Sequence, residues 1–589
     1  MKQFHLTYEN DDKFLKKLDE IKQWCRLNDA CKPVFRIYSD DMVKEHIAHV
    51  CSLLDQYMPD ALYLGCTSNA NILDGALTKS VILLTCTVFE YESTQVKLLQ
   101  YPFSEENYKD AVEYLKRYCE ENPWVNSIEM HATIMNMSMK GYCDEMSTLR
   151  KDIQVFGGGA FNPDMDDETA YVFSKGNGFS QHGVIFLLLG GEDFHVYSTF
   201  VAGWKPLKRR FLITKADKEV LHELDGRPAF EVYQRYLNIE KNDNFFSNTL
   251  EFPLFLEREG VNILRCPLSV NDDDSLVMSS DMEENAYVKI AYGDPDTILS
   301  SIWEDGQKVA DFQPEVIQTF SCAARRAFWS DSNISKETVM FKDVAPTTGF
   351  YTHGEFLRMD GRMLNFNVTL VIVAMREGNP VGKKIDFNGP TFKQQDKIPM
   401  IWRFVSFIEA STAELEAMNQ KLSLAAITDG LTGLYNRAEI ERHIKKTLVK
   451  TEDESEDNSV HLIMLDIDNF KKVNDVYGHK EGDDVIIALS DILRQVAGDL
   501  PQASAGRWGG EEFMMLLEGH STEEVMSAAE RIREAFSTVV FENAGHQTVS
   551  VGVTQMRNGE TADKMCNRVD KALYMAKEAG KNQVVWSDS

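Results

Sequence analysis

Two adjacent glycines followed by two adjacent acids, Gly509 to Phe513 in the sequence AGRWGGEEF, place the tightest constraint on how this chain can fold. The runs 503–508 and 511–517 on either side have strand length, so the segment predicts a β-hairpin that turns at the glycines. Such a turn leaves room for a phosphate group, and paired carboxylates supply hard oxygen ligands for Mg²⁺. The pattern indicates nucleotide chemistry, with a solvated hairpin as the alternative.

The overall composition narrows the class of protein. A formal net charge of -30 over 589 residues argues against a sequence-independent nucleic-acid binder, although a Mg²⁺-shielded nucleotide stays compatible. The longest apolar runs, such as 368–375, have only strand length, so we expect neither a membrane span nor an export signal. Ten cysteines without a CxxC pair favour reduced, buried thiols and a cytoplasmic location.

The order of apolar runs and turns predicts a multidomain α/β and α+β protein. Up to about residue 227, strand-length runs alternate with amphipathic helical stretches, which indicates a mixed α/β layer structure. The helical stretch AFEVYQRYLN begins a second set of strands that ends near residue 376. Glycines, prolines and lysines make 377–397 a predicted loop or boundary.

A helix without glycine or proline is predicted between residues 400 and 427. Its small and apolar residues follow a 3,4,3,4,3 spacing that is typical of paired helices. The helix could form a parallel dimer stalk or pack against the chain's own domain. The seam consists of Ile408, Ser411, Leu415, Met418, Leu422 and Ala425.

The last third carries the chemistry. A buried-strand pattern at 460–465 stops at Asp466, Ile467 and Asp468, and two strand-end carboxylates suit a divalent cation as well as an ordinary cap. The predicted order is a strand, two helices, the hairpin, a helix, a strand, a helix and a short strand. That order predicts a ferredoxin-like palm with an antiparallel centre and helices on one face.

These residues resemble the GGDEF diguanylate cyclases, a family that joins two GTP molecules into cyclic di-GMP. The resemblance covers about 160 residues in the same order and spacing. The matching strings are DGLTGLYNR at 429–437, LDIDNFKKVNDVYGHKEGDD at 465–484, GRWGGEEF at 506–513, SVGVT at 550–554 and DKALYMAKEAGKN at 570–582.

The resemblance implies a role for each matching position. It makes Asp466, Glu511, Glu512 and the carbonyl of Ile467 ligands of two Mg²⁺ ions, with Mn²⁺ as an alternative and Asp468 in an assisting role. Glu511 also helps to deprotonate the attacking 3′-hydroxyl, and Lys471 stabilises the charge that develops during transfer. Substrate binding is assigned to Asn474 and Asp483 at the guanine edge, His479 beside the nucleotide, and Lys577 and Lys581 at the phosphates.

One departure from the family concerns regulation. Many members bind product at an inhibitory RxxD motif, but the corresponding window here is Leu500, Pro501, Gln502 and Ala503, without either charge. We therefore expect no product feedback through this primary site. Because each palm holds one GTP, the resemblance also implies a homodimer through the linker helix and the GGDEF domains.

The front part resembles FIST sensory domains, through segments such as LGCTSNANILDG at 64–75, VFGGGAFNP at 155–163 and FSCAARRAFW at 320–329. The resemblance implies a sensor for an unknown small molecule. Candidate polar pocket groups are Cys322, Arg325, Thr348 and Glu355, for which core or turn roles are equally expected.

Together the expectations describe a cytoplasmic, ligand-regulated diguanylate cyclase without nucleic-acid or membrane partners. The alternative is a silent module that binds GTP or a partner protein. The expected domains are a FIST N-terminal half at 30–227, a FIST C-terminal half at 228–376, a helical linker at 400–427 and a GGDEF domain at 428–589.

Overall fold

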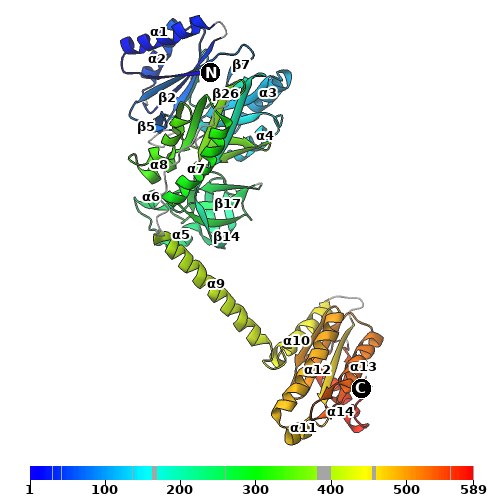
Figure 1. Ribbon diagram of the computed structural model, residues 1–589. Coiled ribbons are helices and arrows are strands. Elements are labelled where there is room, and N and C mark those ends of the chain that lie inside the picture. The colour runs from blue at the N-terminus through cyan, green and yellow to red at the C-terminus, as the bar shows by residue number, and fades with distance from the viewer. Residues whose placement is uncertain are drawn as a thin grey trace. The chain divides into compact units, whose positions relative to one another are not determined.

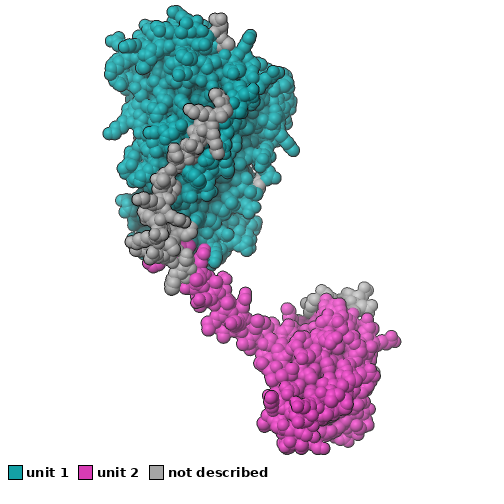
Figure 2. Space-filling model, in the orientation of Figure 1, with its two compact units in different colours: residues 1–396 teal, residues 397–589 magenta. Residues whose placement is uncertain are grey.

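The computed structural model describes residues 1–28, 31–41, 43–134, 137–161, 169–258, 260–380, 400–453, 459–557 and 559–587. It divides into two compact units, residues 1–396 and 397–589, hereafter the first and the second unit (Figure 2). Most of the predicted boundary 377–397 lies outside the described residues. The expectation of a mixed α/β multidomain fold is confirmed.

The first unit contains three copies of one chain pattern: strand, helix, strand, helix, strand, two-stranded hairpin, strand (Figure 1). The first copy consists of β1 (Lys2–Thr7), α1 (Asp11–Leu27), β2 (Lys32–Ser39), α2 (Lys44–Tyr57), β3 (Leu62–Thr67), β4 (Ala70–Leu73), β5 (Ala76–Thr78) and β6 (Ile82–Phe89). The second consists of β7 (Gln95–Pro102), α3 (Tyr108–Glu121), β8 (Val125–Ala132), α4 (Lys140–Met146), β9 (Gln154–Gly159), β10 (Val172–Ser174), β11 (Gly178–Ser180) and β12 (Gly183–Gly190).

The third copy follows the same pattern with a long insertion after its first strand. It consists of β13 (Phe194–Val201), α7 (Pro295–Phe312), β22 (Val316–Cys322), α8 (Ala323–Trp329), the 3₁₀ turns η1 (Ile334–Glu337) and η2 (Val339–Asp343), β23 (Thr347–Thr352), β24 (Glu355–Met359), β25 (Arg362–Phe366) and β26 (Leu370–Glu377). The insertion comprises β14 (Lys205–Asp217), β15 (Val220–Leu224), β16 (Arg227–Pro228), α5 (Ala229–Leu237), α6 (Phe245–Thr249), β17 (Leu254–Arg258), β18 (Val261–Arg265), β19 (Pro267–Val270), β20 (Leu276–Met278) and β21 (Tyr287–Tyr292), whose strands form their own sheet.

The three copies exchange their hairpins in a cycle. Each copy builds one six-stranded sheet, and in each sheet the last two strands come from the hairpin of another copy. The first copy's β4 pairs with β23, the second copy's β10 pairs with β3, and the third copy's β24 pairs with β9. Every sheet of the trio is therefore completed by a neighbour.

Helices cover the outer faces of the three sheets, and the inner faces meet in a shared core. The clusters formed by α1 with α2, α3 with α4, and α7 with α8 each pack on one sheet. The central cluster combines side chains from all three sheets and the insertion. Because β6, β12 and most of β26 are buried on both sides, they appear in the sequence as continuous apolar runs.

A buried ion pair joins the sheets of the first and second copies. Arg36 of β2 donates from Nε to both carboxylate oxygens of Glu129 on β8, at 3.0 and 2.8 Å, and both side chains are fully buried. Desolvation raises the pKa of Glu129, but the charge of Arg36 and a hydrogen bond from His131 lower it to about 2. Both partners are therefore charged in the folded protein.

We expect Arg36→Met to destabilise the first unit by about 3–5 kcal/mol, because Glu129 would remain as an unpaired buried charge. Adding Glu129→Gln should restore part of this loss, since a neutral amide removes that charge. Calorimetric unfolding of the full chain measures both variants. Arg26→Met, at an exposed position of α1, is the control and should change stability by less than about 0.5 kcal/mol. An equal loss of stability in Arg36→Met and Arg26→Met would contradict the prediction.

The second unit begins with the long helix α9 (Met400–Ile427) and continues as a five-stranded palm of order β28-β29-β27-β32-β33. The strands are antiparallel except for the β32–β33 edge pair. The remaining elements are α10 (Arg437–Asp453), β27 (Val460–Ile467), α11 (Phe470–Tyr477), α12 (His479–Asp499), β28 (Ala503–Arg507), β29 (Glu512–Glu518), α13 (Thr522–Thr538), β30 (Val540–Phe541), β31 (Gly545–His546), β32 (Val549–Gln555), α14 (Ala562–Glu578) and β33 (Val584–Trp586).

The prediction that helices cover one face of the palm is wrong. One face packs against α11, α12 and α13, and the other packs against α10 and α14. The reason lies in β27, whose eight residues are all buried, so that both of its faces need cover.

The linker helix α9 presents an apolar seam on its surface. The predicted seam residues Ile408, Leu415, Met418 and Leu422 are 60–63% exposed in the single chain. In the described part of the chain, no helix combines the length and the apolarity that a membrane crossing requires.

Candidate active site

The carboxylates of the palm meet across two paired strands. Asp466 near the end of β27 lies opposite Glu512 of β29 on one side and Ser550 of β32 on the other. The backbone N–H of Ile467 donates to the carbonyl of Glu511 at 3.3 Å. The strand register therefore brings Asp466, Glu511 and Glu512 together where β27 ends and β29 begins.

Charge is crowded around Asp466. Its side chain is 10% exposed, and its closest cation is Lys577 of α14, whose Nζ lies 2.7 Å from Oδ2. Desolvation raises the pKa of Asp466, Lys577 lowers it, and the negative charges of Glu511 and Glu512 raise it again. Desolvation is the largest of these contributions, and the two neighbouring acids add to it, so three carboxylates share the single ammonium group of Lys577.

Asp468 has a structural role in this structure. Its carboxylate accepts hydrogen bonds from the hydroxyls of Thr548 and Ser550, both at 2.7 Å, and from the backbone N–H of Asn582 at 3.1 Å. These bonds connect the end of β27 to β32 and to the segment after α14. Asp468 is thus occupied by protein donors and is 3% exposed.

The glycine turn is held by an arginine. Arg507 donates to the carbonyls of Gly509 and Gly510 and pairs with Asp429 at 3.2 Å. Neither glycine has a positive φ, and a Cβ on Gly510 would meet nothing within 4 Å. The missing side chain at Gly510 therefore leaves open space beside the acids rather than permitting a special backbone conformation.

The residues assigned to guanine lie on two consecutive helices. Asn474 is half-buried on α11, whereas His479 and Asp483 are exposed in the first turns of α12, and Lys471 is exposed on α11. A Cβ on Gly482 would stand 2.0 Å from Oδ1 of Asn474. The glycine thus allows Asn474 to lie against α12.

For GTP, the substrate that the resemblance implies, we expect Gly482→Ala to raise the KM at least about tenfold, because the new methyl group would displace the Asn474 amide; this corresponds to ~1.4 kcal/mol. Steady-state kinetics with GTP measures it. Gly498→Ala in the same helix is the matched control, since a Cβ there meets nothing within 4 Å, and should leave the KM unchanged. Equal KM values for the two variants would refute the prediction.

The two lysines assigned to phosphates lie at the end of α14. Lys577 is 34% exposed on its side chain, and Lys581 donates from Nζ to Oδ1 of Asn469 at 2.6 Å. Since Asn469 lies two residues beyond the end of β27, the lysines and the carboxylates border the same region. The sequence analysis named these two lysines but not Asn469, their neighbour in the structure.

The acids present fit a magnesium ion that a nucleotide helps to hold. Among the described residues there is no cluster of three or more His, Cys, Asp or Glu side chains arranged around a metal site. Mg²⁺ in nucleotide enzymes commonly binds one or two carboxylates together with phosphate oxygens and water. The buried Asp466 carboxylate, with Glu511 beside it, matches that donor set.

The turn of DGLTGLYNR connects α9 to the site, which the sequence did not reveal. The carboxylate of Asp429 accepts from Thr432 and pairs with Arg507, while Asn436 donates from its backbone N–H to the carbonyl of Ile427. Asp429, two residues beyond the end of α9, is therefore joined to the glycine turn through Arg507. Motif spacing marked this segment as a turn but could not show its partners.

The palm fold with strand-end carboxylates and a glycine turn defines a nucleotide-cyclase type of domain, and comparisons with known proteins give its family. The family model "Diguanylate cyclase, GGDEF domain" matches residues 426–583, "FIST N domain" matches 37–227 and "FIST C domain" matches 229–358. The chain thus carries FIST N, FIST C and GGDEF domains in that order, and its second unit belongs to the GGDEF family.

The relatives match part of this chain. Diguanylate cyclase DgcM of Escherichia coli K12 is 37% identical over 174 residues, 29% of this chain and 41% of DgcM. Diguanylate cyclase DgcP of Pseudomonas aeruginosa is 36% identical over 180 residues, 30% of this chain and 26% of DgcP. The GGDEF domain of DgcB from Caulobacter crescentus, solved in complex with c-di-GMP, is 34% identical, with a TM-score of 0.27 and coverage of 28% of this chain and 97% of that one. The chain spans less than half the length of either curated relative.

Proposed function

We propose that this protein is a diguanylate cyclase that condenses two GTP molecules into cyclic di-GMP and two pyrophosphates. The observation that carries the proposal is the register of β27 and β29, which sets Asp466 beside the acids of the glycine turn, with Lys577 next to them. The GGDEF family match and the names of the relatives support the same reaction.

The proposed roles follow from the positions of the side chains. Asp466, Glu511, Glu512 and the Ile467 carbonyl would hold two Mg²⁺ ions, or Mn²⁺, which when bound supply charge stabilisation at the reacting phosphate. Glu511 accepts the proton of the 3′-hydroxyl as its oxygen attacks the α-phosphorus and pyrophosphate leaves. Lys471 stabilises the developing charge, and Lys577 and Lys581 hold the phosphates.

Specificity for guanine would come from Asn474 and Asp483, with His479 beside the nucleotide. Adenine presents the opposite hydrogen-bonding edge, so it would leave polar groups of the site without partners. The half-buried position of Asn474 between two helices supports this role.

A homodimer is part of the proposal. Each palm holds one GTP, so the hydroxyl and the α-phosphate that react come from two chains facing each other. The exposed seam of α9 supplies an apolar surface for a second copy of this helix.

A small molecule bound by the first unit would regulate how the two palms meet. A cytoplasmic location is also part of the proposal, and the ten free cysteines support it, because thiols stay reduced in that compartment.

The decisive experiment incubates the purified full chain with GTP and Mg²⁺ and identifies the product by mass spectrometry. We expect cyclic di-GMP with GTP, none with ATP alone, and none after Mg²⁺ is chelated. The alternative function, a silent module that binds GTP or a partner protein, predicts GTP binding without product. Activity that Glu511→Ala leaves intact would also argue against the proposal.

We expect no inhibition by product through the surface at residues 500–503. Leu500 directly follows α12 and Ala503 begins β28, and neither side chain carries the charge that an RxxD motif has at that position. Initial rates measured with added cyclic di-GMP, up to about 100-fold above the enzyme concentration, should stay constant within twofold. Submicromolar inhibition that a substitution at this surface abolishes would contradict the expectation.

A further inference from the structure

A cavity of about 500 Å³ lies in the first unit where the three copies meet. Asn69, Phe161 and Gly354 line it, and each stands two residues beyond the end of the equivalent strand of its copy, β3, β9 or β23. The cavity therefore occupies the centre of the threefold pattern. Its volume falls in the range of small-molecule sites.

Backbone hydrogen bonds connect the ends of the three strands in a cycle. Phe161 donates to the carbonyl of Thr67, Asn69 donates to Tyr351, and His353 donates to Gly159, at 3.0, 3.0 and 3.2 Å. The strands β3, β9 and β23 each run parallel to the strand before them, β2, β8 or β22. The cavity lies beyond the carboxyl ends of these strands. Open α/β sheets commonly bind ligands at this position.

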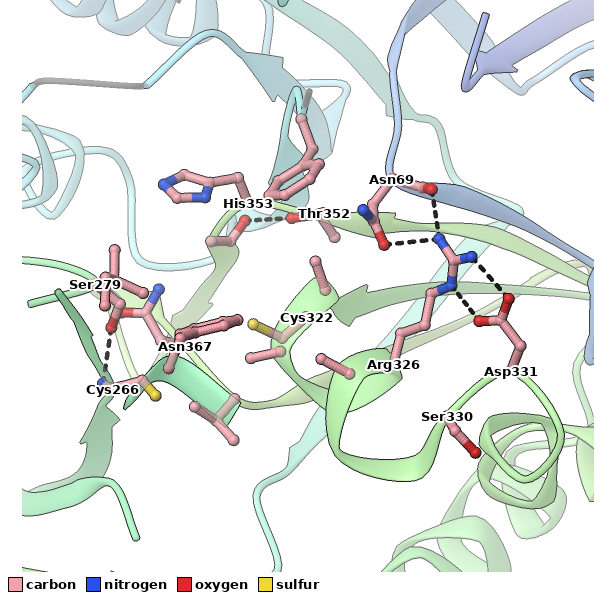
Figure 3. Close-up of a pocket in the computed structure, with 18 residues that line it drawn as sticks. Asn69, Cys266, Ser279, Cys322, Arg326, Ser330, Asp331, Thr352, His353 and Asn367 are labelled. Atoms are coloured by element: carbon pink, nitrogen blue, oxygen red, sulfur yellow. Dashed lines mark hydrogen bonds and ion pairs between the residues drawn. The ribbon is translucent and has the colours of Figure 1, made fainter. Parts of the chain in front are cut away.

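The inserted segment of the third copy closes one side of the cavity. Phe246, Cys266, Leu268 and Ser279 come from the insertion. Figure 3 shows Cys266, Ser279 and Asn367 on one side, the Asn69, Arg326 and Asp331 group on the other, and Cys322 between them. The walls thus combine all three copies with the insertion.

The charged groups of the lining are already paired. Arg326 donates from Nε and Nη2 to the two carboxylate oxygens of Asp331, and from Nη1 to the carbonyl and Oδ1 of Asn69. All three of its nitrogens therefore have partners, and its charge is neutralised. A charged ligand that entered would displace this network or stay without a counter-ion.

The other titratable groups of the lining are neutral at pH 7. Burial raises the pKa of the Cys322 thiol well above its usual value and that of Cys266 to about 12, and it lowers the pKa of His353 to about 4. Glu355 behind Cys322 is fully buried, and desolvation raises its pKa to about 8. Among the described lining residues, no unpaired charge faces the cavity.

The lining offers aromatic surface and one unused donor. The rings of Phe161 and His353 lie 5.7 Å apart, and Phe246, Leu268 and Val368 add apolar surface. Asn367 is 3% exposed, and its Oδ1 accepts from Arg265 at 3.0 Å, while its amide nitrogen has no hydrogen-bond partner within the described chain. A ligand oxygen would satisfy that nitrogen.

We infer that this cavity binds an uncharged aromatic molecule that carries a hydrogen-bond acceptor, and that this molecule is the signal of the first unit. The inference rests on the sensory role proposed above. Arg325, a pocket candidate from sequence, has a structural role instead, because it is buried and pairs with Glu337 at 2.6 Å. Cys322 is the candidate that lines the cavity.

The test compares three probes that share one ring system and differ in charge: 2-naphthamide, 2-naphthoate and 2-naphthamidine. Titration calorimetry on the full chain should give a Kd for 2-naphthamide at least about tenfold lower than for either charged probe. Equal or tighter binding of a charged probe, or absence of 2-naphthamide binding, would overturn the inference.

Two variants locate the binding. Ala323→Phe fills the cavity from α8 and should abolish 2-naphthamide binding, whereas Ala48→Phe on the exposed side of α2 should leave it unchanged. Asn367→Asp keeps the acceptor for Arg265 but removes the amide donor, so it should weaken binding at least about tenfold even if Ala323→Phe folds poorly. Unchanged binding in Asn367→Asp would overturn the assigned contact.

The sensory half of the inference has its own readout. 2-Naphthamide should change the rate of cyclic di-GMP formation, and Asn367→Asp should reduce that response. Selective binding with an unchanged rate would keep the site and overturn its role as the signal. Because binding is measured without GTP, a failure of the cyclase assignment leaves the binding result intact.

Discussion

Glu511→Gln should lower the rate of cyclic di-GMP formation at least about 10³-fold, or ~4 kcal/mol in transition-state stabilisation. Glu511 follows the glycine turn, and its backbone carbonyl accepts a hydrogen bond from the N–H of Ile467. The charge of its side chain raises the pKa of Asp466. The amide can neither accept the proton of the 3′-hydroxyl nor hold a metal ion as a carboxylate does. Loss of a general base alone costs about 10²–10⁴-fold.

The measurement should separate chemistry from folding and binding. Rates at saturating GTP, thermal unfolding and binding of a non-hydrolysable GTP analogue are compared for wild type and variant. Glu523→Gln, on an exposed residue in the first turn of α13, removes an equal charge at a position away from the turn and should keep the full rate. Residual activity above a tenth of wild type in Glu511→Gln would remove the central role of this acid.

The double variant Leu415→Glu and Leu422→Glu should have the second large effect. Both leucines lie on the exposed seam of α9, and four added charges in a paired helix would repel each other across the interface. A paired stalk keeps two palms at an effective concentration in the millimolar range. At about 1 µM protein, its loss should lower the specific activity on the order of 10²-fold.

The dependence on protein concentration gives the sharper readout. The rate of the double variant should rise with the square of its concentration, whereas the wild type should follow the first power. Light scattering should show a monomer for the variant. Ala413→Glu with Gln420→Glu places the same charges at outward positions of the same helix and should remain a dimer. A monomeric wild type with full activity would disprove the stalk.

The sequence predicted the palm well because its elements have local signals. The run 460–465 is apolar and ends in acids, and the glycines at 509 and 510 mark the hairpin, so that strands β27 to β29 follow from periodicity and turn chemistry. The cover on both faces was missed because α10 and α14 are far apart in the sequence and meet only through packing.

The threefold pattern of the first unit was also missed. The alternation of strand-length runs and helical stretches predicted a mixed α/β layer structure, but pairing between copies depends on contacts at long sequence separation. The insertion of residues 205–292 further disguises the third copy. The pairing of Arg507 with Asp429 and that of Arg265 with Asn367 were not predicted for the same reason, since no local pattern indicates a partner 78 or 102 residues away.

The cyclic exchange of hairpins has a consequence for how the first unit can be divided. The boundary between the FIST N and FIST C matches falls at residues 227–229, inside the inserted sheet. A cut there would separate β4 in the N-terminal fragment from its partner β23. It would also separate β24 in the C-terminal fragment from its partner β9. Exposed strand edges of that kind invite aggregation. We therefore expect the three copies to be transferable only as one block, because every sheet takes its last two strands from another copy.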